Sequence, residues 1–173
     1  MDAELVLRRL QPGDKLSGFS LGHANFTPLK MFLKKDAQAY ETNNLARTYA
    51  LFEPEKNVIK AYVTITCGEV ALKDGVEHDG KVNYRFPHYP AVKIARLAVT
   101  EQLKGRGVGK MLVEFSLGVA KELICPHVGC RFAVVDSKAE SVDFYRRCGF
   151  TFLDTPENKS RPNPVMFIDL SKI

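Results

Sequence analysis

The feature that most constrains this chain is a glycine-rich turn between a predicted strand and a predicted helix. The segment 102–110 reads Gln-Leu-Lys-Gly-Arg-Gly-Val-Gly-Lys. An apolar run over 92–99 precedes it, and apolar residues at helical spacing over 108–123 follow it. Such a turn directs several backbone N–H groups at one point, and the helix N-terminus adds partial positive charge. The turn therefore predicts a site for a phosphate or pyrophosphate group, and hence for a phosphorylated cofactor.

Two common phosphate-binding motifs do not match the spacing of these glycines. A triphosphate P-loop has a glycine, four residues, then Gly-Lys-Ser/Thr, whereas here Met111 follows Lys110 and Lys104 takes the place of the first glycine. A dinucleotide fingerprint has its third glycine three positions beyond the second, whereas Gly107 and Gly109 are two apart. Both motifs are therefore excluded.

Length and charge narrow the class of protein. A chain of 173 residues predicts a single domain, 1–173, with a substantial core. No apolar run is long enough to span a bilayer, and the N-terminus lacks the layout of a secretory signal, so we expect a cytoplasmic protein with no membrane association. The net charge of +5 favours anionic partners, among them cofactor phosphates and nucleic acid.

The cysteines point to neither a disulfide framework nor a metal site. Cys67, Cys125, Cys130 and Cys148 are irregularly spaced in a chain that is not small. The segment 125–130 could supply half of a zinc site, but no second ligand pair stands nearby, and a structural zinc needs four ligands. We therefore expect buried, reduced thiols and no metal.

The order of predicted elements indicates helices interleaved with one sheet. Proline at 28 after Thr27 predicts a helix over 27–43 with a capping hydroxyl, and Ser137 to Glu140 reads as a capping box for a helix ending near 148. The third predicted helix covers 108–123. The predicted strands cover 4–10, 47–52, 58–67, 92–99, 131–135, 150–153 and 165–170. Polar, proline-containing loops are expected over 73–90 and 154–164, and the whole pattern predicts an α/β or α+β sandwich.

Three motifs together resemble those of one enzyme family. Gln102-x-x-Gly105-x-Gly107-Val108 resembles the Gln/Arg-x-x-Gly-x-Gly/Ala signature of the GNAT acetyltransferases. The strand 94–99 is similar to the central strand of that family, and 144–150 is similar to its Phe-Tyr-x-x-x-Gly-Phe element. The resemblance covers at least 92–170. It implies an α/β (α+β) fold with a mixed central sheet of six to seven strands, about four helices and two splayed parallel strands.

The resemblance implies that acetyl-CoA is the cosubstrate. Its pyrophosphate would be held by backbone N–H groups of the glycine turn, where glycine allows close approach or a positive φ. Edge N–H groups of Leu97 and Val99 would contact the acetyl carbonyl and the pantetheine arm. The expected cofactor-binding residues are Leu97, Ala98, Val99, Gln102, Leu103, Lys104, Gly105, Arg106, Gly107, Val108, Gly109 and Lys110.

The same resemblance implies how the acetyl group is transferred. Tyr145 is the tyrosine of the Phe-Tyr-x-x-x-Gly-Phe element, and a phenol stays protonated at neutral pH, so it can act as general acid toward the CoA thiolate. The general base is not evident from the sequence. Glu69 is a candidate just beyond the strand 58–67, and His78 and His88 are others in the long loop.

The acceptor amine is open between several classes. The stretches 46–49, 94–99 and 135–140 resemble those of GNAT toxins that acetylate the amino group of aminoacyl-tRNA, which implies tRNA and an antitoxin protein as partners. A homodimer is a further expectation. Candidate phosphate-neutralising residues are Lys30, Lys34, Lys35, Arg85 and Lys93. The alternatives are acetylation of a small-molecule amine, a protein N-terminus or a lysine, and a non-catalytic CoA-binding module.

Overall fold

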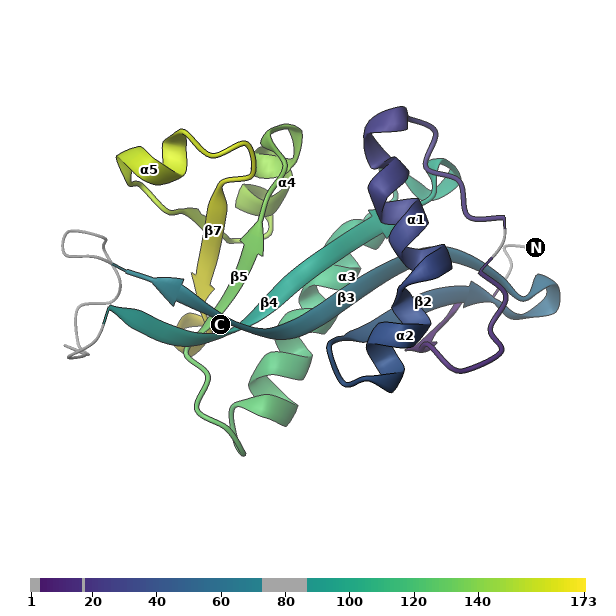
Figure 1. Ribbon diagram of the computed structural model, residues 1–173, viewed down its shortest axis with the longest axis horizontal. Coiled ribbons are helices and arrows are strands. Elements are labelled where there is room, and N and C mark those ends of the chain that lie inside the picture. Colours follow the sequence, from purple (N-terminus) through teal and green to yellow (C-terminus); the bar gives the residue numbers. More distant parts are fainter. Residues whose placement is uncertain (1–3, 17, 73–86) are drawn as a thin grey trace. The chain divides into compact units, whose positions relative to one another are not determined.

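The computed structural model describes residues 4–16, 18–72 and 87–173 (Figure 1). The chain divides into two compact units, each built from two segments. The first unit comprises Met1–Thr66 and Ala95–Val113, and the second comprises Cys67–Ile94 and Glu114–Ile173. The expectation of a single domain over 1–173 stays a prediction.

The predicted mixed α/β fold is confirmed. Seven strands form one sheet in the order β1-β2-β3-β4-β5-β7-β6. The strands are β1 (Val6–Arg9), β2 (Arg47–Glu53), β3 (Val58–Ala71), β4 (His88–Val99), β5 (Phe132–Asp136), β6 (Thr151–Phe152) and β7 (Val165–Asp169). The α-helices among the described residues are α1 (Thr27–Lys35), α2 (Ala37–Thr42), α3 (Val108–Gly118), α4 (Val142–Arg147) and α5 (Pro156–Lys159). The strands β3 and β4 each contribute residues to both units.

The first unit is built on an antiparallel ladder of β1, β2 and β3. The predicted hairpin between β2 and β3 is confirmed, with Arg47 opposite Ile65 and Glu53 opposite Val58. Its turn is a short 3₁₀ helix, Pro54–Lys56, followed by Asn57 at φ 48°. Asparagine tolerates this left-handed conformation better than most residues, which is why it ends the turn.

Helices α1 and α2 supply one side of the core of this unit. Phe32 and Leu33 of α1 and Ala37 of α2 are buried in a cluster with aromatic residues of the N-terminal segment and β3. The predicted single helix over 27–43 is interrupted at Asp36, whose φ of −113° lies outside the helical range. Aspartate is a weak helix former, which favours the break at this position.

The predicted capping hydroxyl of Thr27 is wrong. Thr27 is the first residue of α1, and the residue at the N-cap position, Phe26, makes no side-chain capping bond. A 3₁₀ turn, Ala24–Phe26, precedes the helix, and His23 Nδ1 accepts a hydrogen bond from the Asn25 N–H. The capping side chain therefore lies four residues earlier than the sequence pattern predicts.

The second unit contains the parallel strand pair. β5 pairs in parallel with β4 from Ala91↔Phe132 to Ile94↔Val135, and β7 pairs antiparallel with both β5 and β6. β4 continues for five residues beyond its last pair with β5. Parallel strands are normally buried, and the apolar runs of β4 and β5 agree with this rule.

Both β3 and β4 are longer than the predicted strands 58–67 and 92–99. β3 extends to Ala71, and β4 begins at His88, inside the predicted loop 73–90. The additional residues are held by burial of Val70 and Tyr89 in the core of the second unit. The rest of the predicted loop, 73–86, lies outside the described residues.

Two predicted helices differ in detail from the observed ones. α3 ends at Gly118 and continues as a π-helical segment, Val119–Ile124. The predicted capping box at 137–140 is wrong, because the Ser137 hydroxyl donates to the carbonyl of Lys138 at 2.8 Å and a 3₁₀ turn precedes α4. In the predicted loop 154–164, a short helix, α5, begins after Thr155, whose hydroxyl accepts a hydrogen bond from the Asn158 N–H.

Candidate functional site

The glycine turn has the left-handed backbone that its sequence predicts. Gly105 and Gly107 lie at φ +74° and +78°, and Gly109 is already inside α3. A Cβ atom added at Gly105 or Gly107 would meet nothing within 4 Å. Glycine is therefore required here by backbone conformation, since L-residues with side chains adopt this region at a cost.

Three N–H groups of the turn close it internally. The N–H groups of Leu103, Lys104 and Arg106 donate to carbonyl groups three residues earlier, at 2.9, 3.2 and 3.3 Å. In the first helical bond of α3, the Met111 N–H donates to the carbonyl of Gly107 at 3.0 Å. These bonds hold the turn in one shape without any ligand.

Four further N–H groups remain available at the same place. The N–H groups of Gly105, Gly107, Val108 and Gly109 have no hydrogen-bond acceptor among the described residues. They stand at the N-terminus of α3, an eleven-residue helix whose dipole adds partial positive charge. A cluster of unused donors at a helix N-terminus is suited to an anion such as a pyrophosphate.

The side chains of the turn bind it to the rest of the first unit. Lys104 Nζ donates to the carbonyl of Leu21 at 3.4 Å and lies 5.0 Å from the ring centre of Phe26. Gln102 Oε1 accepts from Lys60 Nζ at 3.3 Å. Lys104 and Gln102 therefore link the turn to the rest of the first unit, although they are exposed, as are Arg106 and Lys110.

The predicted strand contacts lie in the same unit as the turn. Ala98 faces inward, because it is buried in the core cluster beneath α1 and α2. Leu97 and Val99 are half-buried and point to the opposite face of β4, as alternation along a strand requires. The structure therefore brings Leu97 to Val99 and the glycine turn together as one continuous segment.

Tyr145 belongs to the second unit and is almost fully buried in α4. Its side chain is 6% exposed, and its ring centre lies 5.0 Å from that of Phe144 and 5.6 Å from that of Phe150. Burial, with a smaller contribution from Cys148, raises the pKa of Tyr145 well above the ordinary value for a phenol. Its hydroxyl has no hydrogen-bond partner among the described residues, so its proton is available to a bound group.

The candidate bases Glu69 and His88 contact each other. Glu69 lies inside β3 rather than beyond the strand, which corrects the predicted position. Its Oε1 is 2.9 Å from Nδ1 of His88 in β4, and the two side chains are 65% and 54% exposed. This carboxylate–imidazole pair could orient the ring and accept a proton. His78 lies outside the described residues.

The predicted phosphate-neutralising residues are not equivalent. Lys34 and Lys35 are exposed on α1, and Lys30 is half-buried there. Lys93 is paired with Asp136 at 2.5 Å, so its charge is already compensated. Arg85 lies outside the described residues.

The cysteines are free thiols with different exposure. Cys67 is exposed, contrary to expectation, because it points outward from β3, and Cys125, Cys130 and Cys148 are half-buried. The Cys125 thiol donates to the carbonyl of Cys130 at 3.1 Å. No group of three or more His, Cys, Asp or Glu side chains in the described part of the chain could hold a metal ion.

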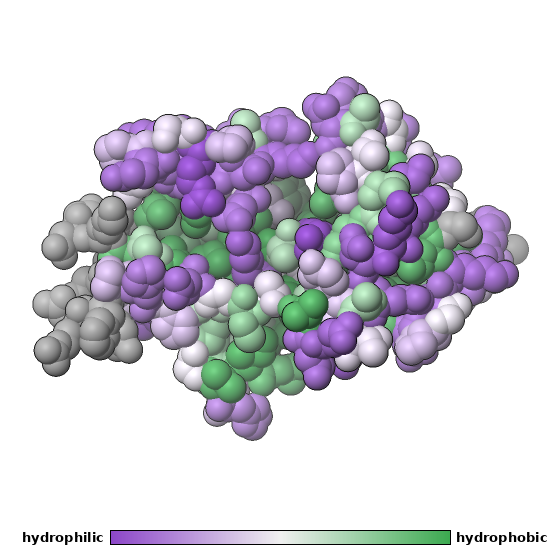
Figure 2. All heavy atoms as spheres, in the orientation of Figure 1, coloured by the Kyte–Doolittle hydropathy of each residue, from purple (hydrophilic) through white to green (hydrophobic). Residues whose placement is uncertain are grey.

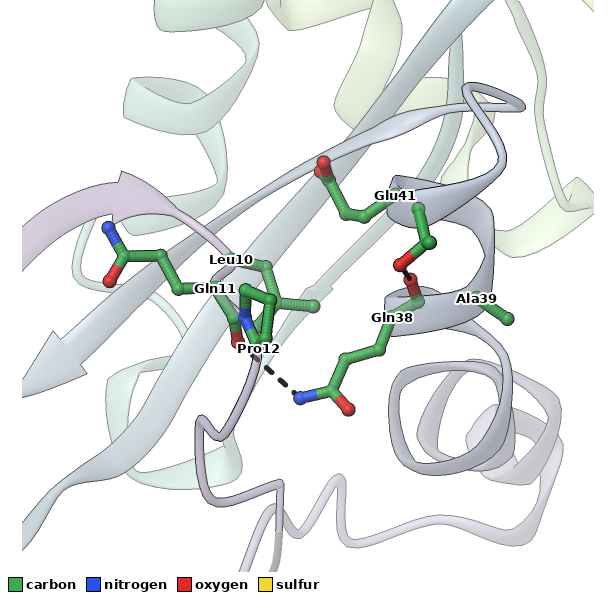
Figure 3. Close-up of a pocket in the computed structure, with 7 residues that line it drawn as sticks. Leu10, Gln11, Pro12, Gln38, Ala39 and Glu41 are labelled. Carbon is green, nitrogen blue, oxygen red and sulfur yellow. Dashed lines mark hydrogen bonds between the residues drawn. The ribbon is translucent and has the colours of Figure 1, made fainter.

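A small cavity elsewhere in the first unit contains none of the predicted site residues (Figure 3). It has a volume of about 170 Å³ and lies between α2 and the residues that follow β1. Gln38 Nε2 donates across it to the carbonyl of Gln11 at 3.4 Å. Glu41 is already bound by Arg9, Arg47 and the Thr48 N–H. Ligand pockets are usually larger, at about 300 Å³ or more, so the cavity is not a candidate catalytic site.

The sequence analysis missed one charged residue of β4. The guanidinium carbon of Arg96 lies 3.7 Å from the ring centre of Phe32 and 5.7 Å from that of Tyr40. The signal was a second cation, after Lys93, within the apolar run 92–99.

Comparison with known proteins shows which family the chain matches. Residues 34–150 match the model of the acetyltransferase (GNAT) family. The chain is similar in structure to the toxin AtaT complexed with acetyl-methionyl-tRNAfMet, at 22% identity and a TM-score of 0.82, covering 98% of this chain and 96% of that one. None of the helices within the described ranges is long and apolar enough to cross a membrane.

Two further solved structures share the fold. A tyrosine-to-phenylalanine mutant of AtaT, bound to the C-terminus of the antitoxin AtaR and acetyl-CoA, is 23% identical with a TM-score of 0.75, covering 98% of this chain and 95% of that one. A tyrosine-to-phenylalanine mutant of KacT is 21% identical with a TM-score of 0.82, covering 97% and 96%.

Proposed function

The chain belongs to the acetyltransferase (GNAT) family, as its glycine turn and its Phe-Tyr-x-x-x-Gly-Phe element predicted, and from this premise we propose that it acetylates aminoacyl-tRNA. Acetyl-CoA is the donor, and the acceptor is the amino group of the tRNA-linked amino acid. The single observation that carries the donor assignment is the set of unused N–H groups at the start of α3.

In the proposed complex, the pyrophosphate of acetyl-CoA accepts hydrogen bonds from Gly105, Gly107, Val108 and Gly109. These donors need no rearrangement, because the N–H groups of the neighbouring residues already hold the turn. Arg106 and Lys110 are exposed beside them, where they add positive charge. Edge N–H groups of Leu97 and Val99 are the proposed contacts of the acetyl carbonyl and the pantetheine arm.

Transfer then proceeds by direct attack. The neutral amine attacks the carbonyl carbon of the thioester, and a C–N bond forms as the C–S bond breaks. Tyr145 donates the proton of its hydroxyl to the departing sulfur. A phenol is protonated at neutral pH, and burial raises the pKa of Tyr145 further, so the hydroxyl carries its proton until the thiolate develops.

The proton lost by the amine needs an acceptor. We propose the pair of Glu69 and His88, acting directly or through water, since Glu69 binds Nδ1 and leaves Nε2 of the ring to accept the proton. Both side chains are exposed, which provides a route for the proton to bulk solvent.

The acceptor class is supported by charge and by the related toxins. Lys34 and Lys35 are exposed cations on α1, and the net charge is +5. A solved complex of AtaT contains acetyl-methionyl-tRNAfMet, and another contains part of the antitoxin AtaR. We propose tRNA as the substrate of this chain and an antitoxin as its protein partner.

The test is a screen of acceptors with thiol release as the readout. Charged tRNA, free amino acids, small amines and lysine peptides are compared at a fixed acetyl-CoA concentration. We expect charged tRNA to be acetylated with the highest kcat/KM and Tyr145→Phe to lower kcat by about 10²- to 10⁴-fold, as for other general acids. Phe144→Leu, at the neighbouring position in α4, is the control.

Two results would contradict parts of this proposal. Turnover of a small amine with none of charged tRNA would assign the alternative acceptor class. Unchanged turnover in Tyr145→Phe would remove the tyrosine as the acid. Growth arrest on expression of the wild type, absent with Tyr145→Phe, is the result expected of a toxin.

A further inference from the structure

Arg96 occupies an unusual setting for an arginine. It is half-buried in β4, and its guanidinium stacks 3.7 Å from the ring centre of Phe32. Within the described ranges, it has neither a carboxylate partner nor a hydrogen-bond acceptor. Arginine is rarely withdrawn from water without a paired anion. The guanidinium of Arg96 therefore has no paired anion among the described residues, and a bound anion would supply one.

The aromatic residues around Arg96 fix its orientation. The rings of Phe32 and Tyr40 meet edge to face at 5.3 Å, and Phe32 also stacks on Tyr62 at 6.5 Å. Tyr62 is fully buried and donates its hydroxyl proton to the carbonyl of Leu29 at 2.7 Å, which fixes the ring on which Phe32 stacks. A stacked guanidinium keeps its N–H fork free at the edge, in the geometry that binds a phosphate through two hydrogen bonds.

We infer that Arg96 binds a phosphate group of the acceptor next to its reactive amine. The inference rests on the proposed function, in which the acceptor is an aminoacyl-tRNA. Its amino acid carboxyl group is esterified, so the nearest anion to the amine is the phosphodiester that precedes the terminal adenosine.

The position of Arg96 along β4 agrees with this assignment. It lies one to three residues before Leu97 to Val99, the proposed contacts of the acetyl and pantetheine groups, and each strand residue advances the chain by about 3.3 Å. The Cα atom of Arg96 therefore lies within about 10 Å of the backbone at those contacts. The exposed Lys34 and Lys35 on α1, the helix that supplies Phe32, add positive charge for the RNA backbone.

The experiment compares two acceptors that differ by one phosphate. The first is an adenosine 5′-methyl phosphate, a phosphodiester, carrying an amide-linked amino acid at its 3′ position, and the second is the same aminoacyl-adenosine without the methyl phosphate. We expect Arg96→Gln to lower kcat/KM for the first by about 10- to 150-fold, mainly through KM, and for the second by less than about 2-fold. Arg96→Lys should recover part of the loss, because it keeps the charge without the planar fork.

Matched measurements separate this role from a structural one. Lys121→Gln removes the same charge from an exposed position on the π-helical segment and should leave both acceptors unaffected. The Tm and the Kd for acetyl-CoA should be the same in Arg96→Gln and the wild type. Equal losses on both acceptors, or full activity of Arg96→Gln on the phosphate-bearing one, would overturn the assignment.

Binding without turnover distinguishes this inference from the proposed function. The trinucleotide cytidyl-cytidyl-adenosine, which cannot be acetylated, should bind the wild type more tightly than Arg96→Gln by a similar factor. If the wild type binds the trinucleotide more tightly than Arg96→Gln does but acetylates no charged tRNA, the phosphate site at Arg96 is supported and the proposed acceptor is wrong. Equal affinity of the two proteins for the trinucleotide rejects the site at Arg96.

Discussion

At the scale of single residues, local surroundings decide what each candidate site residue can do. Gly107 has open space around its Cα atom, so its importance lies in its φ of +78°. Tyr145 is the opposite case, because it lies in an ordinary helix, α4, and its burial raises the pKa of the phenol. Gly107 thus fixes the directions of the N–H groups in the turn, and Tyr145 supplies a hydroxyl proton.

Gly107→Val should weaken acetyl-CoA binding and lower stability. A β-branched residue at this φ costs about 1–2 kcal/mol of unfolding free energy, or the turn changes shape and its N–H groups diverge. Urea denaturation and calorimetric titration with acetyl-CoA measure the two effects. Gly118→Ala, inside α3 with nothing near its Cβ position, should be neutral or stabilise by up to about 1 kcal/mol. If Gly107→Val bound acetyl-CoA with the affinity of the wild type, binding of the pyrophosphate by the N–H groups of the turn would be ruled out.

The stability contributed by Asp169 should depend on pH. Burial acts to raise its pKa, but hydrogen bonds from the Ser171 N–H and hydroxyl, together with Arg131 at 2.8 Å, hold it below the ordinary value. A lowered folded-state pKa stabilises the protein above the unfolded-state value of about 3.9, and the contribution is lost as the pH falls through the folded-state pKa.

Asp169→Asn is therefore expected to lower the unfolding free energy by about 1–2 kcal/mol at pH 7 and by less below about pH 4. Urea denaturation across that range measures the difference. Asp154→Asn, at an exposed side chain paired with Lys159, is the matched control and should change little at any pH. A difference that stays constant with pH would show that the Asp169 charge is not the cause.

At the scale of elements, the connection between β6 and β7 is held by one buried amide. Asn158 of α5 is 2% exposed, and its Nδ2 donates to the carbonyl groups of Leu153 and Val165 at 2.8 and 2.9 Å. Its Oδ1 accepts from the Val165 N–H at 2.7 Å. The side chain therefore replaces strand pairing at the point where the ladder of β6 and β7 ends.

Asn158→Ala should destabilise the protein by about 2–4 kcal/mol, because it removes three hydrogen bonds and leaves the Val165 N–H unpaired. Thermal or urea unfolding measures the loss. Asn163→Ala, at an exposed position of the same connection, should change the unfolding free energy by less than about 0.5 kcal/mol. Similar stability of the two variants would mean that water satisfies the groups around position 158.

The elements that were predicted correctly are those specified by local patterns. The hairpin through Asn57, the turn at Gly105 and Gly107, and the helix after it follow from apolar spacing and from residues with special backbone preferences. The capping box at Ser137 failed because its hydroxyl reaches the next carbonyl instead. The spacing of residues in the sequence could not show whether the Ser137 hydroxyl would cap the helix or bind the carbonyl of Lys138.

Contacts between distant parts of the chain could not be predicted in this way. His88 meets Glu69 across 19 positions, and Arg96 meets Phe32 across more than 60. Such pairs depend on which strands are neighbours and on where each helix packs. One sequence contains the residue types but not these distances, so the Arg96 stack was missed.

At the scale of the whole molecule, excess positive charge favours a polyanionic partner. The net charge is +5, and Figure 2 shows mainly hydrophilic residues over α1. Hydrophobic residues gather over the C-terminal end of α3 in that view, and Leu123 and Val128 just beyond it are 63% and 64% exposed. The expected homodimer stays a prediction.

Affinity for tRNA should fall steeply with salt. Each neutralised phosphate contributes about 0.7–0.9 to the slope of log K against log salt concentration, so replacing Lys30, Lys34 and Lys35 together by Gln should reduce the slope by about 2. Filter binding between 50 and 200 mM salt measures it. The single replacement Lys172→Gln, at an exposed residue, is the control for loss of charge. A slope unchanged by the triple replacement would place the RNA elsewhere.

The N-terminal segment sets a limit on the smallest piece of this chain that can fold. The family match begins at residue 34, yet Phe19 and Leu21 are core residues, and the carbonyl of Leu21 receives Lys104 from the glycine turn. A fragment cut to 34–150 would also lose β6 and β7, and with β7 it would lose the antiparallel partner of β5. The boundaries of the family match are therefore narrower than the set of residues that build the core and the sheet, and residues outside the match contact the turn inside it.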